Sequence, residues 1–184
     1  MYDLNDASEK LVSNYQEPGI FDNVKISDIK LGETSVNKVS YIELHTIGDK
    51  GSLGKSNKMF LSTDVKEGKK MSAWSITARN LVDLISVTNN TSEEEAKGAI
   101  KGVESKEQLV SKLSAILVGK PFRAKFKGEI SEKGLTFATL DSIESMSIPK
   151  EQSRLRFNPD RDIKKHVNAN PAPQQGAVAS DLPF

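Results

Sequence analysis

The chain has 184 residues, enough for one domain with appendages, and its 36% hydrophobic and 28% charged residues are typical of a globular protein. It has no stretch of the roughly 20 apolar residues that a membrane-spanning helix needs, no basic and apolar blocks of a signal peptide in its first residues, and no cysteine for disulfides or thiolate zinc sites. We therefore expect a cytoplasmic protein. The net charge of +1 is inconclusive for nucleic acid, because binding depends on where the charges lie.

The first half of the chain changes from polar to strand-like and then to helical patterning. Residues 1–19 are a polar extension with helical potential over 8–15, and a glycine-rich loop is expected over 48–55. Runs of β-forming residues predict strands over three ranges: 20–31, 38–47 and 58–63. The residues that repeat with helical spacing, and so predict a first helix, are Trp74, Ala78, Leu81 and Ile85.

The second half contains two more predicted helices and a hairpin. One helix is expected over 92–100, where Thr91 and Glu94 have capping-box spacing, and another begins after Ser105. Strand alternation returns over 121–128 and 135–143, joined by a short turn.

The order of these elements predicts an α+β fold, mostly β with a helical insertion. Three strands, a helical insertion of roughly 45 residues and two further strands are the arrangement of an OB-fold, a five-stranded partly open barrel with its helix between strands three and four. A different small α+β domain is the alternative. We expect four regions: the extension 1–19, the domain 20–149, a basic mixed-charge arm 150–167, and a disordered tail 168–184 that is rich in Asn, Ala, Pro and Gln.

The strand 121–128 has the clearest charge pattern. Arg123, Lys125 and Lys127 lie two residues apart and so project from one face, with Phe122, Ala124 and Phe126 on the other. A row of cations can track a phosphate backbone. An ordinary solvated outer face over a buried Phe row explains the pattern equally well.

Other candidate contacts with nucleic acid lie on the second and third strands, in the glycine loop and in the arm. Tyr41 and Phe60 are candidate platforms on which bases stack, although core packing explains Tyr41 equally well. Trp74, Phe122 and Phe126 are expected in the core. Lys50, Lys55 and Lys58 either clamp a strand or belong to a solvent loop. Arg154 and Arg156 lie just before Phe157, separated from each other by Leu155. They belong to an arm that either adds phosphate contacts, folds back onto the domain, or is a neutral linker.

Signs of catalysis are weak. His45 and His166 lack metal-ligand spacing, and there is no nucleophile elbow or dinucleotide fingerprint. We therefore expect a binding protein that is not an enzyme and has neither cofactor nor metal.

The sequence printed here ends in Asp181, Leu182, Pro183 and Phe184, after a linker that includes Asn170 to Gly176. Pro-Phe on a flexible leash suits capture by an apolar pocket with a basic rim. This linker and tip resemble those of the single-stranded DNA-binding protein family, here of phage type. The resemblance implies an OB-fold that binds single-stranded DNA, and a tip whose Pro183 and Phe184 anchor in polymerase, helicase, primase or nuclease partners. It also implies that the tip competes with DNA for the binding surface. The family tip usually has several acids, whereas Asp181 is the only one here.

The expected function is therefore sequence-independent single-stranded DNA binding in replication, recombination or repair, with the tail recruiting partners. Two rivals remain. One is an accessory interaction module whose domain binds protein, and the other is a nucleic-acid enzyme such as an annealing or nuclease factor. The sequence leaves the oligomeric state open.

Overall fold

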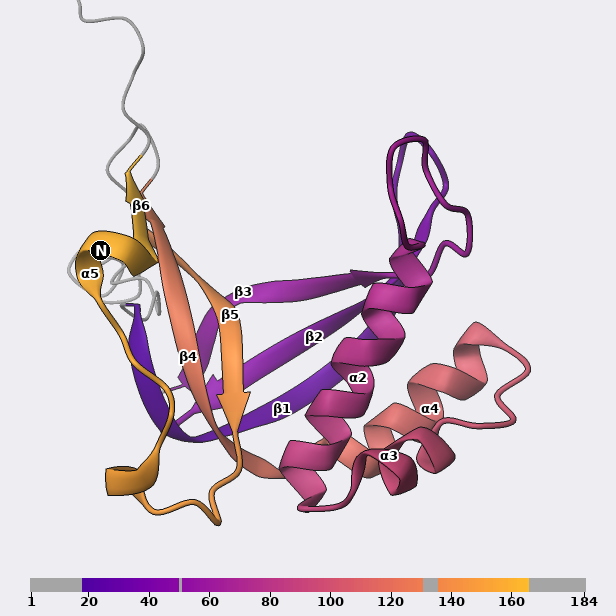
Figure 1. The fold of residues 1–184 in the computed structure, drawn as a ribbon. Coiled ribbons are helices and arrows are strands. Elements are labelled where there is room, and N and C mark those ends of the chain that lie inside the picture. Colours follow the sequence, from indigo (N-terminus) through magenta and orange to yellow (C-terminus); the bar gives the residue numbers. More distant parts are fainter. Residues whose placement is uncertain (1–17, 50, 131–135, 166–184) are drawn as a thin grey trace, which may run out of the picture.

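The computed structural model describes residues 18–49, 51–130 and 136–165 (Figure 1). Most of the predicted extension 1–19, the tail 168–184 and its terminal tip therefore lie outside the described residues.

One mixed sheet organises the described chain. β1 (Gly19–Glu33), β2 (Ser40–Gly48) and β3 (Gly51–Phe60) form an antiparallel meander, and β4 (Pro121–Ile130) and β5 (Thr136–Glu144) form an antiparallel hairpin. β4 also pairs with β1, which gives the order β3-β2-β1-β4-β5, and the short β6 (Ile163–Lys165) runs parallel to β4. All five strands expected from the sequence are present.

Three helices connect β3 to β4, as the sequence predicts. They are α2 (Ala73–Asn89), α3 (Glu93–Ala99) and α4 (Lys106–Leu117). The predicted stripe on α2 is buried at Leu81 and Ile85, and these side chains pack with Phe122 and Phe126 of β4 in one core. Trp74 packs against this core while staying partly exposed. In Figure 1, α2 lies across one end of the sheet, with α3 and α4 beyond it.

The sheet is open. β3 and β5 lie against each other, but within the described ranges no hydrogen-bonded ladder joins them. The α+β class is therefore confirmed, while a closed five-stranded barrel is not formed, and β6 adds a sixth strand to the sheet.

Two local predictions were wrong. The glycine-rich segment expected as a loop over 48–55 mostly forms β3, because Gly48 pairs with Gly51 and the strand begins there. The capping box of α3 uses Ser92 and Glu95, one residue later than predicted. The backbone of Thr91 still belongs to the end of α2, where its N–H donates to the Ser86 carbonyl 3.1 Å away, and α3 begins after Ser92.

Residues 145–165 run back along the sheet. They include a 3₁₀ turn (Lys150–Gln152) and α5 (Pro159–Asp162), and they end in β6 beside β4 (Figure 1). Gly128 of β4 admits this arrangement, since a Cβ there would lie 2.4 Å from Pro18 and 3.3 Å from Ile163. Of the three alternatives for the predicted arm, the folded-back one is what the structure has over residues 150–165.

No helix in the described part of the chain is long and apolar enough to cross a membrane.

Candidate nucleic-acid interface

The predicted cationic row on β4 is occupied by the protein's own acids. Arg123 is only 4% exposed, and its guanidinium bonds Asp22, Glu144 and the Ile148 carbonyl, the last two at 2.9 and 3.2 Å. The side chain therefore faces the segment that follows β5, and two carboxylates compensate its charge.

Lys125 and Lys127 are held in the same way. The Lys125 ammonium lies 2.8 Å from Asp141 and 3.7 Å from the fully buried Asp162, and Lys127 also pairs with Asp141. Both sequence interpretations of the row, a phosphate-tracking face and a solvated face, required exposed side chains, whereas the structure buries Arg123 and Lys125. Direct DNA contact by these three cations stays a prediction, but their charges are already compensated.

The acids of this network are ionised readily. Burial raises the pKa of Glu144, but hydrogen bonds from Ser153, the Arg154 N–H and Arg123 outweigh it, so the pKa lies below its ordinary value. The hydrogen bond from Arg161, followed by that from the Asn158 N–H, holds the pKa of Asp162 well below its usual range. These ion pairs and hydrogen bonds therefore hold residues 144–162 against β4, and we call this network the clasp.

The arginines of the arm take part in the same fold-back. The Arg154 N–H donates to Glu144 at 2.7 Å, and the Arg156 guanidinium donates to the Ser153 and Leu155 carbonyls at 2.6 and 2.8 Å. Both residues are exposed, and the next residue of the arm, Phe157, is half-buried. Their predicted role in DNA binding stays a prediction.

An aromatic pair lies on the outer face of β2 and β3. Ile42 and Leu44 of β2 point inward and are buried, so the alternation turns Tyr41 outward. The register sets Tyr41 directly opposite Phe60 of β3. Their rings meet edge to face, with centroids 5.9 Å apart and an interplanar angle of 66°.

Two neighbours fix the ring of Tyr41. Gly32 on β1 pairs with Tyr41, and a Cβ at Gly32 would lie 2.6 Å from the Tyr41 ring. The ring therefore packs directly over the backbone of Gly32. The ammonium of Lys58 lies 4.4 Å from the ring centroid and donates to the hydroxyl at 3.2 Å. Tyr41 therefore holds Lys58 and Phe60 in place, and Phe60, 39% exposed, presents the more open ring.

Of the three lysines predicted around the glycine segment, only Lys58 has a described side chain and it joins the aromatic pair. Lys50 lies outside the described residues. Lys55 is on β3, but its side chain also lies outside the described part.

The sequence interpretation overlooked the loop over residues 61–72, which begins immediately after Phe60. It carries Lys66, Lys69 and Lys70, and all three residues are exposed. The signal was present as Lys-Glu-Gly-Lys-Lys, a turn composition with three cations in five residues.

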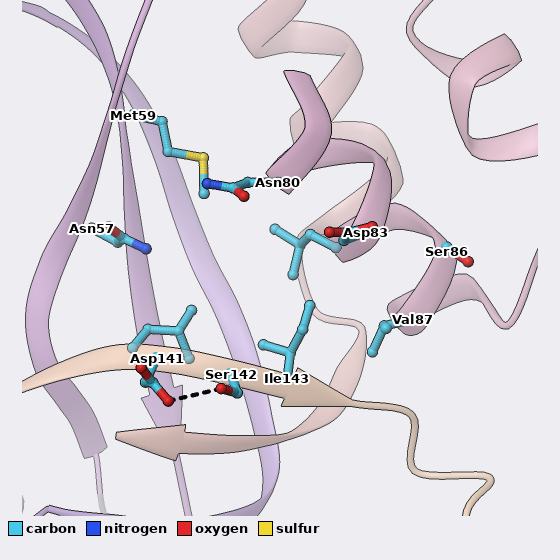
Figure 2. Close-up of a pocket in the computed structure, with 11 residues that line it drawn as sticks. Asn57, Met59, Asn80, Asp83, Ser86, Val87, Asp141, Ser142 and Ile143 are labelled. Atoms are coloured by element: carbon cyan, nitrogen blue, oxygen red, sulfur yellow. Dashed lines mark hydrogen bonds between the residues drawn. The ribbon is translucent and has the colours of Figure 1, made fainter. Parts of the chain in front are cut away.

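A cavity of about 590 Å³ lies where β3, α2 and β5 meet, along the open seam of the sheet (Figure 2). Met59 and Asn80 approach each other on one side, and Asp141 accepts a hydrogen bond from Ser142 on the other. Its charged lining residues are the carboxylates Asp83 and Asp141, of which Asp141 is paired with Lys125 and Lys127. Within the described residues, no cluster of His, Asp and Glu is arranged to hold a metal ion.

The described surface therefore has an acidic seam at β3 and β5 and an aromatic and cationic region at Tyr41, Lys58 and Phe60. No protein-family model matches the chain, and no relative is found among curated proteins.

Proposed function

We propose that the protein binds single-stranded DNA without sequence preference, on the outer face of β2 and β3, and that it is not an enzyme. The observation that carries the proposal is the Tyr41, Phe60 and Lys58 cluster, in which an exposed ring and a cation lie side by side. Base stacking on an aromatic ring is tolerant of sequence because every base has a π-face.

The strand order supports an OB-fold-like architecture. A β1-β2-β3 meander, pairing of β1 with β4, and helices between β3 and β4 are the connections of that fold, with the β3–β5 closure left unpaired here. In OB-folds, the face of strands two and three binds oligonucleotides. Tyr41 and Phe60 lie on those strands.

Each residue of the cluster has a separate role in the proposal. Phe60 stacks on a base, Lys58 pairs with the phosphate beside it, and Tyr41 holds both at the correct spacing. Lys58 is available for this because its contacts are with a neutral ring and hydroxyl, whereas Arg123 and Lys125 are engaged by carboxylates.

The proposal includes the resemblance to single-stranded DNA-binding proteins of phage type. The terminal Asp181, Leu182, Pro183 and Phe184 recruit replication proteins such as polymerase, helicase or primase, and the folded domain supplies DNA binding. The competing function is an accessory module whose domain binds protein, and exposed Phe60 suits that function as well.

Binding of an oligo-dT strand and of a duplex of equal length, measured across a salt series, separates these functions. The proposal predicts strong preference for the single strand and an affinity that falls as salt rises. Equal, weak binding to both nucleic acids contradicts it and favours the protein-binding module.

The site itself is tested by Phe60→Ala. Stacking is worth about 1–3 kcal/mol per base, so affinity for oligo-dT is expected to fall about 5- to 150-fold with little change in the salt dependence. Phe60→Trp should keep the affinity. Val118→Ala is the matched control, since Val118 is also 39% exposed but caps α4. Equal effects of both alanine variants would place DNA binding elsewhere.

Deletion of residues 181–184 tests the division of labour. DNA binding is expected to survive or tighten, while capture of a polymerase, helicase or primase partner is lost. Loss of DNA binding on this deletion would contradict a recruiting role for the tip.

A further inference from the structure

The loop over residues 61–72 is anchored at the aromatic pair. Its first residues continue β3 beyond Phe60, with the Leu61 N–H donating to the Ser40 carbonyl at 2.9 Å. The loop closes where the Trp74 N–H donates to the Ser62 carbonyl and the Thr77 hydroxyl donates to the Phe60 carbonyl, both at 2.8 Å. The loop therefore leaves and returns beside Phe60. Figure 1 shows it projecting past the first turn of α2.

A tight turn gathers the lysines of this loop. The Lys69 N–H donates to the Lys66 carbonyl at 3.0 Å, and Gly68 at the third position has φ of +73°, a conformation that favours glycine. In such a turn the first and fourth Cα atoms lie within about 7 Å, so Lys66 and Lys69 are neighbours. Lys70 follows directly.

These three ammonium groups have no carboxylate partner among the residues that the structure describes. Several lysines elsewhere are paired with acids: Lys125 and Lys127 with Asp141, and Lys97 with Glu93. Unpaired cations release counterions when a polyanion binds, which is the electrostatic source of affinity for nucleic acid.

The same loop exposes apolar side chains. Val65 is 58% and Met71 48% exposed, and Val36 in the neighbouring β1–β2 turn is 86% exposed. Together with Phe60 they are among the most exposed large apolar side chains of the described chain. Apolar surface beside unpaired cations suits a ligand with both bases and phosphates.

We infer that the loop over residues 61–72 is the second half of the DNA interface: Lys66, Lys69 and Lys70 contact phosphates of the strand whose bases stack on Phe60. This rests on the proposed function and adds the direction of the path, which leaves the β2–β3 face over the end of β3 toward α2. It leads away from the acidic seam lined by Asp83 and Asp141.

The test compares two triple variants that each remove three positive charges. Lys66→Gln, Lys69→Gln and Lys70→Gln alter the loop, and Lys120→Gln, Lys150→Gln and Lys164→Gln alter exposed lysines on other elements. Oligo-dT affinity is measured across a salt series for each full-length protein. The slope of log affinity against log salt is about −0.7 per phosphate contacted, so the loop variant should lose about 2 units of slope, and the control variant should keep the wild-type slope.

Equal slopes in the two variants, or a loop variant that keeps the wild-type slope, would overturn the inference. In both cases wild-type preference for the single strand and sensitivity to Phe60→Ala leave the proposed function standing. If the wild type does not prefer single-stranded DNA, the proposed function fails and the inference fails with it.

Two controls complete the test. The urea midpoint should be unchanged in the loop variant because the three side chains are exposed. If the midpoint changes, the DNA affinity is calculated from the concentration of folded protein, so that a loss of stability is not mistaken for a loss of binding. Vesicles containing phosphatidylserine are added in place of DNA. Loss of vesicle binding in the loop variant with an unchanged DNA slope assigns the lysines to a lipid surface and overturns the inference.

Discussion

Replacing Arg123 by methionine tests whether the cations of β4 are structural. Methionine keeps the apolar stem of the side chain but removes the guanidinium group and its charge. Glu144, 6% exposed, then loses the guanidinium 2.9 Å away. Removing one partner of a buried ion pair typically costs about 3–5 kcal/mol of unfolding free energy.

We expect Arg123→Met to lie near the low end of that range. Asp22, the other carboxylate bound to Arg123, is 34% exposed and is hydrated once the pair is broken. Glu144 also keeps its hydrogen bond from the Arg154 N–H at 2.7 Å. With a urea dependence of about 2 kcal/mol per M, a loss of about 3 kcal/mol lowers the urea midpoint by about 1.5 M.

The double variant Arg123→Met with Glu144→Gln isolates the cause. Glutamine still accepts the Arg154 N–H but carries no charge, so the double variant should recover more than half of the loss. Urea unfolding followed by far-ultraviolet circular dichroism at pH 7 measures all three proteins. An unchanged midpoint in Arg123→Met, or a double variant less stable than the single one, would refute a buried ion pair. If Arg123 instead binds phosphate, the variant loses salt dependence for oligo-dT at unchanged stability.

Three further predictions concern the pH dependence of stability, the packing of Gly32 under the ring of Tyr41, and a helix cap. Because Glu144 and Asp162 have pKa values below their ordinary ones, the stability that they contribute is complete above about pH 4.5 and is lost progressively as the pH falls toward their folded values. The urea midpoint should therefore start to drop near pH 4.5 and should still be falling below pH 3. Gly32→Ala places a methyl group 2.6 Å from the ring of Tyr41; we expect a changed near-ultraviolet tyrosine signal and several-fold weaker oligo-dT binding, with the overall fold retained. Ser92→Ala removes the capping box of α3 and should cost about 1 kcal/mol in urea unfolding.

Local periodicity was sufficient for most of the elements. The stripe on α2, the hairpin of β4 and β5 and the buried Phe122 and Phe126 follow from residues close in sequence. The glycine segment before Asn57 was misjudged because its pairing partner is β2, and glycines in a two-residue hairpin resemble those of a mobile loop.

The fate of the β4 cations was not predictable from the strand itself. Alternation shows that Arg123 and Lys125 share a face, but it does not show what covers that face. The cover comes from Glu144, Asp162 and the chain between them, about 20 to 40 residues downstream. A mixed-charge segment after the last hairpin strand was the available signal, since its acids needed partners as much as its arginines did.

The Tyr41 and Phe60 pair shows the opposite case, in which a distant contact follows from simple rules. Each residue is exposed by strand alternation, and antiparallel register alone brings them together across 19 positions of sequence. Gly32 adds a requirement that composition cannot show, because its missing side chain matters only once the ring of Tyr41 lies over it.

A net charge of +1 is compatible with binding a polyanion because some cations of this chain are paired with acids while others are not. The clasp on β4 sets Arg123, Lys125 and Lys127 against Asp22, Asp141, Glu144 and Asp162, so that region contributes little attraction at distances beyond the Debye length of about 10 Å. The loop lysines Lys66, Lys69 and Lys70 lack such partners in the described chain. Neutralising those three lysines near Phe60 should therefore weaken the attraction of a DNA strand more than removing any three paired cations.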